Sequence, residues 1–179
     1  MTPSARIIIS LLLVFVTTAC SKPGQHSPNE SIAVPTASPT AQRITSESVV
    51  KVESQPVEIR AGGSGEAVVR VAIQSGYHVN ANPPTYPYLK ATELEISPTE
   101  GVSVAFVTYP KGLNKKFVFA EKPLSVYESN TELKATLKAD KSMTAGQRSV
   151  SARLRIQACD EQVCYPPGTV ELAIPVKIK

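Results

Sequence analysis

From about residue 49 to the end of the chain, apolar and polar residues alternate in short runs, and no window favours helical spacing. The clearest run leads from Arg148 to Ala158, with apolar residues at every second position, and a second run covers Thr169 to Ile178. Because successive side chains of a strand point to opposite faces, this period of two predicts β-strands with one buried face. Shorter runs of the same kind contain Val50, Val52, Val57, Ile59, Ala67, Val69, Val71, Ile73, Leu94, Ile96, Val102, Val104, Leu133 and Leu137.

Turn residues separate these runs, as at Gly62-Gly63-Ser64-Gly65. Many short strands with turns between them predict an all-β fold, an antiparallel β-sandwich of the immunoglobulin-like kind. The alternating part has about 130 residues, enough to bury one core, so we expect a single domain over residues 48–179. No internal repeat is present in the sequence.

The first residues of the chain have the pattern of a secretory signal. Arg6 is followed by the apolar run Ile7 to Val16 and by small residues up to Ala19. This apolar run is too short for a membrane-spanning helix. Cys20 directly after Ala19 makes the segment similar to a bacterial lipoprotein signal. We therefore expect a signal peptide over residues 1–19 and lipid attachment at Cys20, with the outer membrane favoured by Ser21. The alternative is ordinary cleavage that leaves Cys20 free.

Residues 20–47 are rich in Ser, Pro, Thr, Gln and Asn and lack apolar periodicity, so we expect a disordered tether there. The whole chain has a formal net charge of +4 with its lysines scattered among acids. This charge distribution, without a basic stripe or an aromatic stacking motif, gives no support for nucleic-acid binding.

Cys159 and Cys164 are the cysteines of the folded part, and four residues separate them between the two long strand runs. This spacing predicts a hairpin with one cysteine on each side of its tip, where facing Cα atoms lie about 4.5–5.5 Å apart. That separation permits a disulfide. Cys159 falls among the polar positions of its strand, so the pattern predicts that it points away from the core. The neighbouring acids Asp160 and Glu161 disfavour a thiolate at Cys159.

A second consequence of the strand pattern concerns register. If Cys159 faces Cys164 and pairing continues without a break, Leu154 stands opposite Thr169, although one residue is apolar and the other polar. One additional residue must therefore be accommodated. Pro166-Pro167 is the place where a bulge is tolerated.

Three sequence features together resemble the N-terminal periplasmic domain of the thiol:disulfide interchange protein DsbD, over about Val49 to Lys179. They are the Cys-x4-Cys-Tyr-Pro-Pro pattern at Cys159, the segment Gly76-Tyr77-His78-Val79-Asn80 and the segment Leu124-Ser125-Val126-Tyr127-Glu128. The resemblance implies an immunoglobulin-like sandwich whose redox-active pair, Cys159 and Cys164, carries electrons in the periplasm without a cofactor. It also implies that Cys164 forms the mixed disulfide.

The same resemblance implies partners and a cellular role. The partners would be thioredoxin-fold periplasmic proteins, and a membrane electron transporter or periplasmic reductase would supply electrons to this chain as a free-standing lipoprotein. The activity would be of the protein-disulfide reductase type, and cytochrome c maturation is among the processes that such electron transfer serves.

The resemblance also indicates which residues surround the cysteines. Related domains place aromatic and polar residues after the Gly-Tyr pair, which here points to Tyr77 and His78, and Tyr165 follows the second cysteine. A cap loop with an aromatic residue precedes the segment at Leu124, so we expect Phe119 to cover the disulfide, with Phe117 as the second choice. For these phenylalanines the alternative is a short strand that feeds the core.

Other interpretations of the same residues are open. His78 as a surface or capped histidine is the alternative to a site residue, and a copper or zinc site at Cys159, Cys164 and His78 is conceivable from ligand chemistry, although we expect no metal. In an exported protein, a cysteine pair is by default a structural disulfide. The alternative function is therefore a lipid-anchored binding or assembly module.

Overall fold

The alternating runs form two four-stranded sheets in the computed structural model, which describes residues 43–179. The predicted signal peptide, Cys20 and the tether up to residue 42 lie outside the described residues. The strand order of the first sheet is β1 (Val50–Ser54), β3 (Ser64–Ile73), β9 (Asn130–Ala139) and β6 (Val102–Thr108). That of the second is β2 (Val57–Ile59), β12 (Gly168–Ile178), β10 (Gly146–Ile156) and β5 (Glu93–Ile96).

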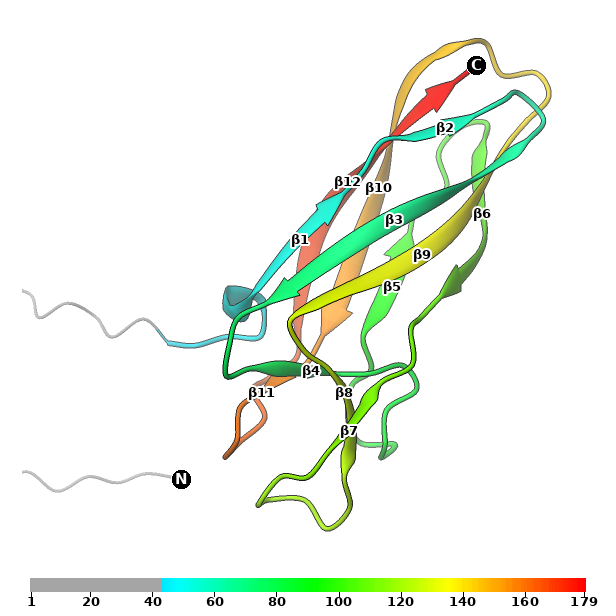
Figure 1. Cartoon of the computed structure of the whole chain (residues 1–179). Helices are drawn as coiled ribbons and strands as arrows, with labels where there is room; N and C mark the ends of the chain where they lie inside the picture. Colours follow the sequence, from blue (N-terminus) through cyan, green and yellow to red (C-terminus); the bar gives the residue numbers. More distant parts are fainter. Residues whose placement is uncertain (1–42) are drawn as a thin grey trace, which may run out of the picture. The chain divides into compact units, whose positions relative to one another are not determined.

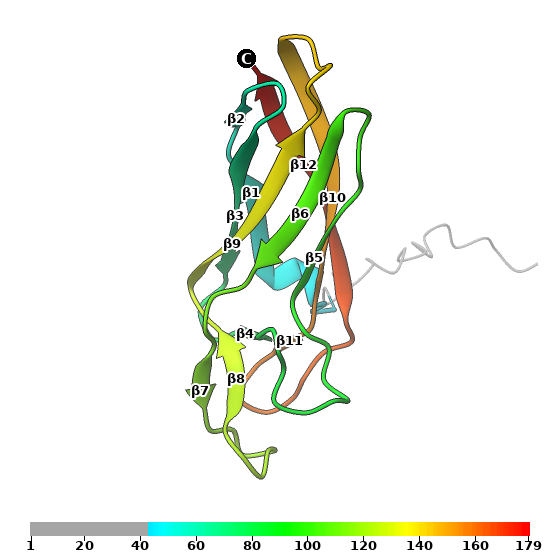
Figure 2. The ribbon, with the colours of Figure 1, turned by 90° about the vertical axis from the view of Figure 1, so that its right-hand side faces the viewer.

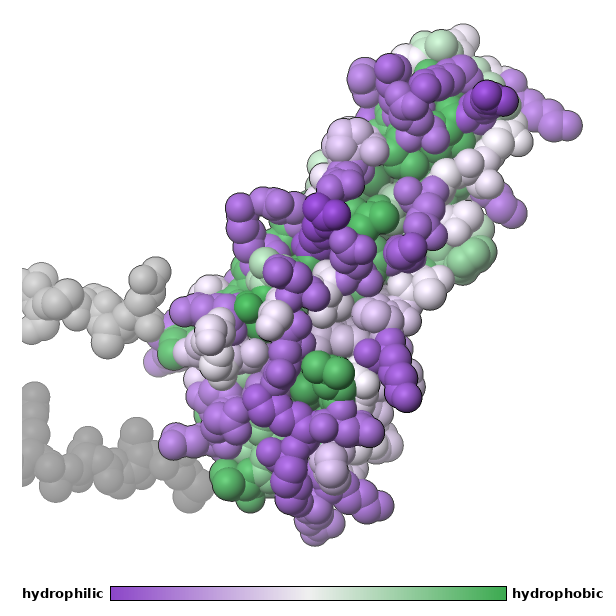
Figure 3. Space-filling view, viewed as in Figure 1, coloured by the Kyte–Doolittle hydropathy of each residue, from purple (hydrophilic) through white to green (hydrophobic). Residues whose placement is uncertain are grey.

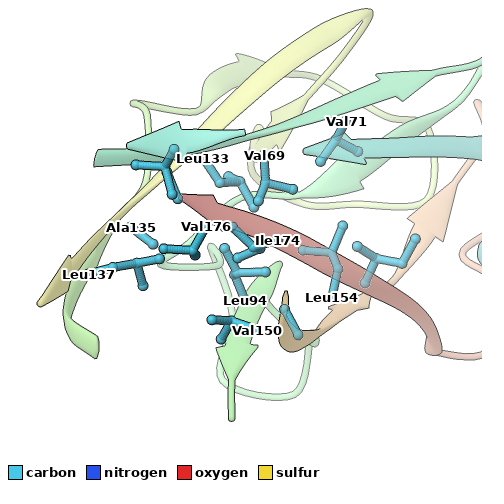
Figure 4. Close-up of a cluster of buried hydrophobic side chains, with 14 of the residues drawn as sticks. Val69, Val71, Leu94, Leu133, Ala135, Leu137, Val150, Leu154, Ile174 and Val176 are labelled. Carbon is cyan, nitrogen blue, oxygen red and sulfur yellow. The ribbon is translucent and has the colours of Figure 1, made fainter. Parts of the chain in front are cut away.

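These two sheets face each other as an immunoglobulin-like sandwich, which confirms the predicted fold class (Figure 1). All neighbouring strands pair antiparallel except β2 and β12, which run parallel. The apolar positions of the alternating runs point between the sheets, so Val69 and Leu133 of one sheet face Leu154 and Ile174 of the other (Figure 4). The described residues contain no helix long and apolar enough to cross a membrane.

A third, smaller sheet lies at one end of the sandwich (Figures 1 and 2). Its strands are short, and the sequence pattern did not predict them as strands. Their order is β11 (Ala158–Cys159), β4 (His78–Asn80), β8 (Leu124–Tyr127) and β7 (Leu113–Lys115). This sheet brings together the short strand that carries Cys159, the Gly-Tyr-His segment and the two strands that flank the predicted cap loop.

The folded part begins earlier than residue 48. Ser46 is fully buried, and a short 3-10 helix, η1 (Glu47–Val49), leads from it into β1. Ser46 and Glu47, which the composition assigned to the tether, therefore belong to the packed domain.

Candidate functional site

Cys159 and Cys164 form a disulfide with an S–S distance of 1.97 Å, as the spacing predicted. The two residues face each other in an isolated antiparallel bridge at the tip of the hairpin between β11 and β12. Their Cα atoms are 3.9 Å apart, closer than the expected separation.

The register of the hairpin contains the predicted offset. In the long ladder Leu154 pairs with Val170 and Ile156 with Gly168, one step away from the register of the cysteine bridge. Between the two pairings, Gln157 and Ala158 oppose Tyr165, Pro166 and Pro167. The additional residue is thus accommodated in the arm that contains both prolines, where no ladder hydrogen bond is lost to them.

The outward orientation predicted for Cys159 is wrong. Cys159 is fully buried, whereas Cys164 is partly exposed. Strand β10 ends at Ile156, and after Gln157 the chain pairs with β4 instead of continuing the ladder. Ala158 is also fully buried, so both faces of this short strand are covered and the alternation of β10 does not extend to it.

Asp160 fixes the conformation of the hairpin tip. One carboxylate oxygen, Oδ1, accepts hydrogen bonds from the backbone N–H groups of Gln162 (2.7 Å) and Val163 (2.8 Å). The other, Oδ2, accepts one from the Tyr165 hydroxyl at 2.6 Å. The bond from Tyr165 and the two backbone donors lower the pKa of Asp160. The bond to the Asp160 carboxylate raises the pKa of Tyr165 to about 12. The carboxylate therefore stays ionised beside Cys159.

Ser46 holds both arms of the cysteine hairpin. Its Oγ accepts a hydrogen bond from the backbone N–H of Ala158 (2.9 Å), and its hydroxyl donates to the carbonyl of Pro166 (2.6 Å). No pattern in the sequence indicates this role, because a serine in a Ser/Thr/Pro-rich stretch has the composition of a tether. The hairpin is therefore anchored by a residue more than a hundred positions away.

Replacing Ser46 by alanine should lower the free energy of unfolding by about 2 kcal/mol, because a buried N–H and a buried carbonyl lose their shared partner. Urea denaturation of the disulfide form measures this loss. Ser48→Ala is the matched control. The Ser48 hydroxyl donates to the Thr45 carbonyl (2.8 Å) and accepts from the Thr45 N–H (3.0 Å), and both bonds are exposed, so this change should alter stability by less than about 0.5 kcal/mol. Equal effects of the two changes would contradict the anchoring role.

His78 lies directly opposite Cys159 in the small sheet. Its side chain is fully buried, neither ring nitrogen has a hydrogen-bond partner, and its ring stacks on Phe117 with centroids 4.2 Å apart. Burial, assisted by the nearby Lys115 cation, lowers the pKa of His78 to about 4, so the imidazole is neutral. The alternative of a surface or capped histidine is therefore wrong.

Phe117 and Phe119 occupy the loop between β7 and β8, in a turn and not in a strand. Phe117 is buried in a cluster separate from the main core, with Leu89, Leu124 and Val126. Phe119 is 41% exposed, and its ring stacks on Phe117 at 5.3 Å. The loop therefore has an inner ring against His78 and an outer ring toward solvent.

Lys115, the last residue of β7 before the loop, forms an ion pair with the cysteine hairpin. Its Nζ lies 2.7 Å from Glu128 Oε1 and 2.9 Å from Glu161 Oε1, and Glu161 belongs to the hairpin tip. Glu161 is 61% exposed, so the pair with it contributes at most about 1 kcal/mol. This contact can separate at little energetic cost.

A hollow of about 370 Å³ lies between the loop and the hairpin, and Cys164 is in its wall while Cys159 is not. Its rim includes three exposed apolar side chains, Tyr88, Phe119 and Val163. Hydrophobic surface (green in Figure 3) also appears among hydrophilic residues at the end of the domain that carries β7, β8 and the hairpin. Cys164 is thus reached from solvent across an apolar surface.

The remaining predicted residues, Tyr77 and Tyr165, do not line this hollow. The rings of Tyr77 and Tyr165 are tilted against each other, with centroids 6.1 Å apart. The structure thus brings all the predicted surrounding residues to the small sheet and its loops. Within residues 43–179, no group of three or more His, Cys, Asp and Glu side chains is placed to hold a metal ion.

Residues 46–175 match the family model described as thiol:disulfide interchange protein DsbD, N-terminal. No curated protein matched the chain. Among solved structures, the N-terminal periplasmic domain of ScsB from Proteus mirabilis is similar in fold, with a TM-score of 0.52 and 16% identity. The match covers 70% of this chain and 45% of that one, so the chain spans less than half the length of its structural relative.

Two further structures are less similar. A family 123 glycoside hydrolase from Clostridium perfringens has a TM-score of 0.35 at 7% identity, covering 73% of this chain and 27% of the hydrolase. AggA, the major subunit of aggregative adherence fimbriae type I from Escherichia coli, has a TM-score of 0.32 at 11% identity, covering 73% and 94%. At these scores neither likeness bears on function.

Proposed function

Because the chain belongs to the family of DsbD N-terminal domains, a thiol:disulfide interchange family, we propose that it passes electrons through its Cys159–Cys164 pair in the periplasm. The partners are thioredoxin-fold proteins on one side and a membrane electron transporter or periplasmic reductase on the other. Cys20 carries the lipid anchor, and the outer membrane is the favoured location. Cytochrome c maturation is one process that the electrons serve.

The unequal exposure of the two sulfurs carries this proposal. Cys164 lies in the wall of the apolar hollow, whereas Cys159 is fully buried. An incoming thiolate attacks Cys164 Sγ, forms a mixed disulfide there, and the electron pair of the broken bond leaves on Cys159 Sγ. Electron transfer in the opposite direction reverses the same steps. A purely structural disulfide does not require one sulfur at an open apolar surface.

Phe119 acts as the outer part of a cap in this proposal. Its ring lines the hollow beside Cys164, and Lys115 at the start of the loop pairs with the exposed Glu161 of the hairpin. A docking partner that covers Tyr88 and Val163 displaces the outer Phe119 ring at small energetic cost, while Phe117 stays buried. The cap therefore limits exchange with unspecific thiols without contributing much to stability.

The test is a mixed-disulfide trap in cells that contain candidate partners. Cys159→Ser leaves Cys164 without its resolving thiol, so partner proteins should accumulate as adducts that run as larger species on non-reducing gels and disappear with dithiothreitol. Cys164→Ser should capture far fewer, because Cys159 is buried.

The doubly substituted Cys159→Ser, Cys164→Ser protein is the matched control, since it detects adducts formed through Cys20. A Cys159→Ser protein that runs only as a monomer, in cells where the candidate partners are expressed, would contradict the exchange function. A structural disulfide would give that result.

A further inference from the structure

His78 is a buried, neutral base that the exchange reaction described above does not use. We propose that His78 accepts a hydrogen bond, and then the proton, from the Cys159 thiol of the reduced protein. This inference rests on the proposed exchange function and assigns a proton acceptor to it.

The placement of the two residues supports this role. His78 and Cys159 are an antiparallel pair of β4 and β11, and the side chains of such a pair lie on the same face with Cβ atoms about 4.5–5.5 Å apart. Both side chains are fully buried. Water therefore does not compete for the interaction.

The disulfide form leaves His78 without a partner. Both ring nitrogens are unpaired, which is unfavourable for buried polar atoms, and a disulfide sulfur has no hydrogen to donate. Reduction converts Cys159 into a thiol with an S–H donor opposite the ring. The hydrogen bond that His78 lacks can therefore form only after reduction, which favours the reduced state.

The same pair avoids an isolated buried charge when Cys159 attacks the mixed disulfide at Cys164. With a partner bound through Cys164, Cys159 Sγ gives its proton to His78 and attacks Cys164 Sγ. The intramolecular disulfide forms, the bond to the partner breaks, and the partner's sulfur leaves with the electron pair and receives the proton back from His78. A lone thiolate in this buried position is unfavourable, whereas a thiolate beside an imidazolium carries no net charge.

Charged groups from the surrounding elements act on His78 in opposite directions. Lys115 of β7 disfavours its protonation, while Glu128 after β8 and Asp160 and Glu161 of the hairpin tip favour it. Burial is the largest influence and keeps the ring neutral in the disulfide form, so a protonated His78 needs the Cys159 thiolate beside it as its counter-ion.

The experiment follows both thiols of the reduced full-length chain in a Cys20→Ser background, where the pair supplies the only cysteines. An aromatic disulfide that releases a coloured thiol reacts first at Cys164, and the attack of Cys159 on the adduct releases a second equivalent. In His78→Phe, which keeps a ring against Phe117, we expect the second release to slow about tenfold or more near neutral pH. The first release should stay within about twofold.

The pH profile and the redox equilibrium separate a proton acceptor from a packing residue. The second release of His78→Phe should keep rising with pH where that of the unsubstituted protein has levelled off. The equilibrium with glutathione should shift about tenfold toward the disulfide. His78→Gln keeps a hydrogen-bond acceptor but no base. Its equilibrium with glutathione should therefore return part of the way to that of the unsubstituted protein, while its pH profile should stay like that of His78→Phe.

Identical second-release profiles of the unsubstituted and His78→Phe proteins would overturn the role of His78 and leave the exchange function intact. If His78→Phe does not fold, the profile of His78→Gln decides in the same way. Absence of any first release from the unsubstituted reduced protein would instead contradict the exchange function itself.

Discussion

Replacing Phe117 by alanine should lower the free energy of unfolding by about 3–5 kcal/mol. The ring is 1% exposed, packs against Leu89, Leu124 and Val126, and stacks on His78. Truncation leaves a cavity inside a small cluster that connects the cap loop to the third sheet. Urea denaturation of the disulfide form, followed by circular dichroism, measures the loss.

Phe119→Ala is the matched control, because it removes the same ring from the neighbouring outer position. With 41% of the residue exposed, we expect a loss of about 1 kcal/mol or less. The reduced pair should instead react faster with a small alkylating reagent, since the ring lines the hollow beside Cys164. A large loss of stability for Phe119→Ala with unchanged thiol reactivity would contradict the cap and assign Phe119 to the core.

The sandwich could be predicted because its strands are long and half-buried. In β3, β9 and β10 every second residue faces the other sheet, so apolar residues recur at every second position of the sequence. The offset at Pro166-Pro167 was also predictable, since it follows from parity alone once the two cysteines are taken as a facing pair.

The small sheet could not be predicted in the same way. All residues of β4 are buried on both faces, so His78, Val79 and Asn80 show no alternation, and a histidine and an asparagine do not have the composition of a buried strand. Asn80 is accommodated because its Nδ2 donates to the Lys90 carbonyl (3.2 Å) and to Gln157 Oε1 (3.1 Å). Such contacts join distant parts of the chain and leave no local pattern.

The burial of Cys159 does not follow from the strand pattern, for a related reason. The strand phase was extended through Gln157, but this residue turns its side chain to the loops, where Oε1 accepts from the Lys90 N–H (2.9 Å) and Nε2 donates to the Tyr165 carbonyl (3.2 Å). The ladder of β10 ends there, and β11 begins with a new partner. The alternation of buried and exposed side chains therefore holds only within one continuous ladder.

Acidification from pH 6.5 to pH 4 should destabilise the disulfide form by about 3 kcal/mol through His78 alone. The pKa of this histidine is about 4 in the folded chain against an ordinary value of 6.5. Between these values the unfolded chain binds the proton and the folded chain does not, so protonation favours unfolding as the pH falls. Above pH 6.5 His78 is neutral in both states and no stability is lost through it. Below pH 4 it is protonated in both states, so the loss of stability levels off.

The measurement is urea denaturation of the disulfide form across this pH range, compared between the unsubstituted protein and His78→Phe. Carboxylates whose pKa values are lowered, such as those of Glu47 and Asp160, also weaken the fold in acid, but both proteins contain them and they cancel in the comparison. His26, the second histidine of the chain, cancels likewise. The difference between the two curves should therefore change by about 3 kcal/mol. Parallel curves from pH 6.5 to pH 4 would mean that His78 is protonated in the fold as readily as in water, and it could then not be the buried neutral acceptor that faces Cys159.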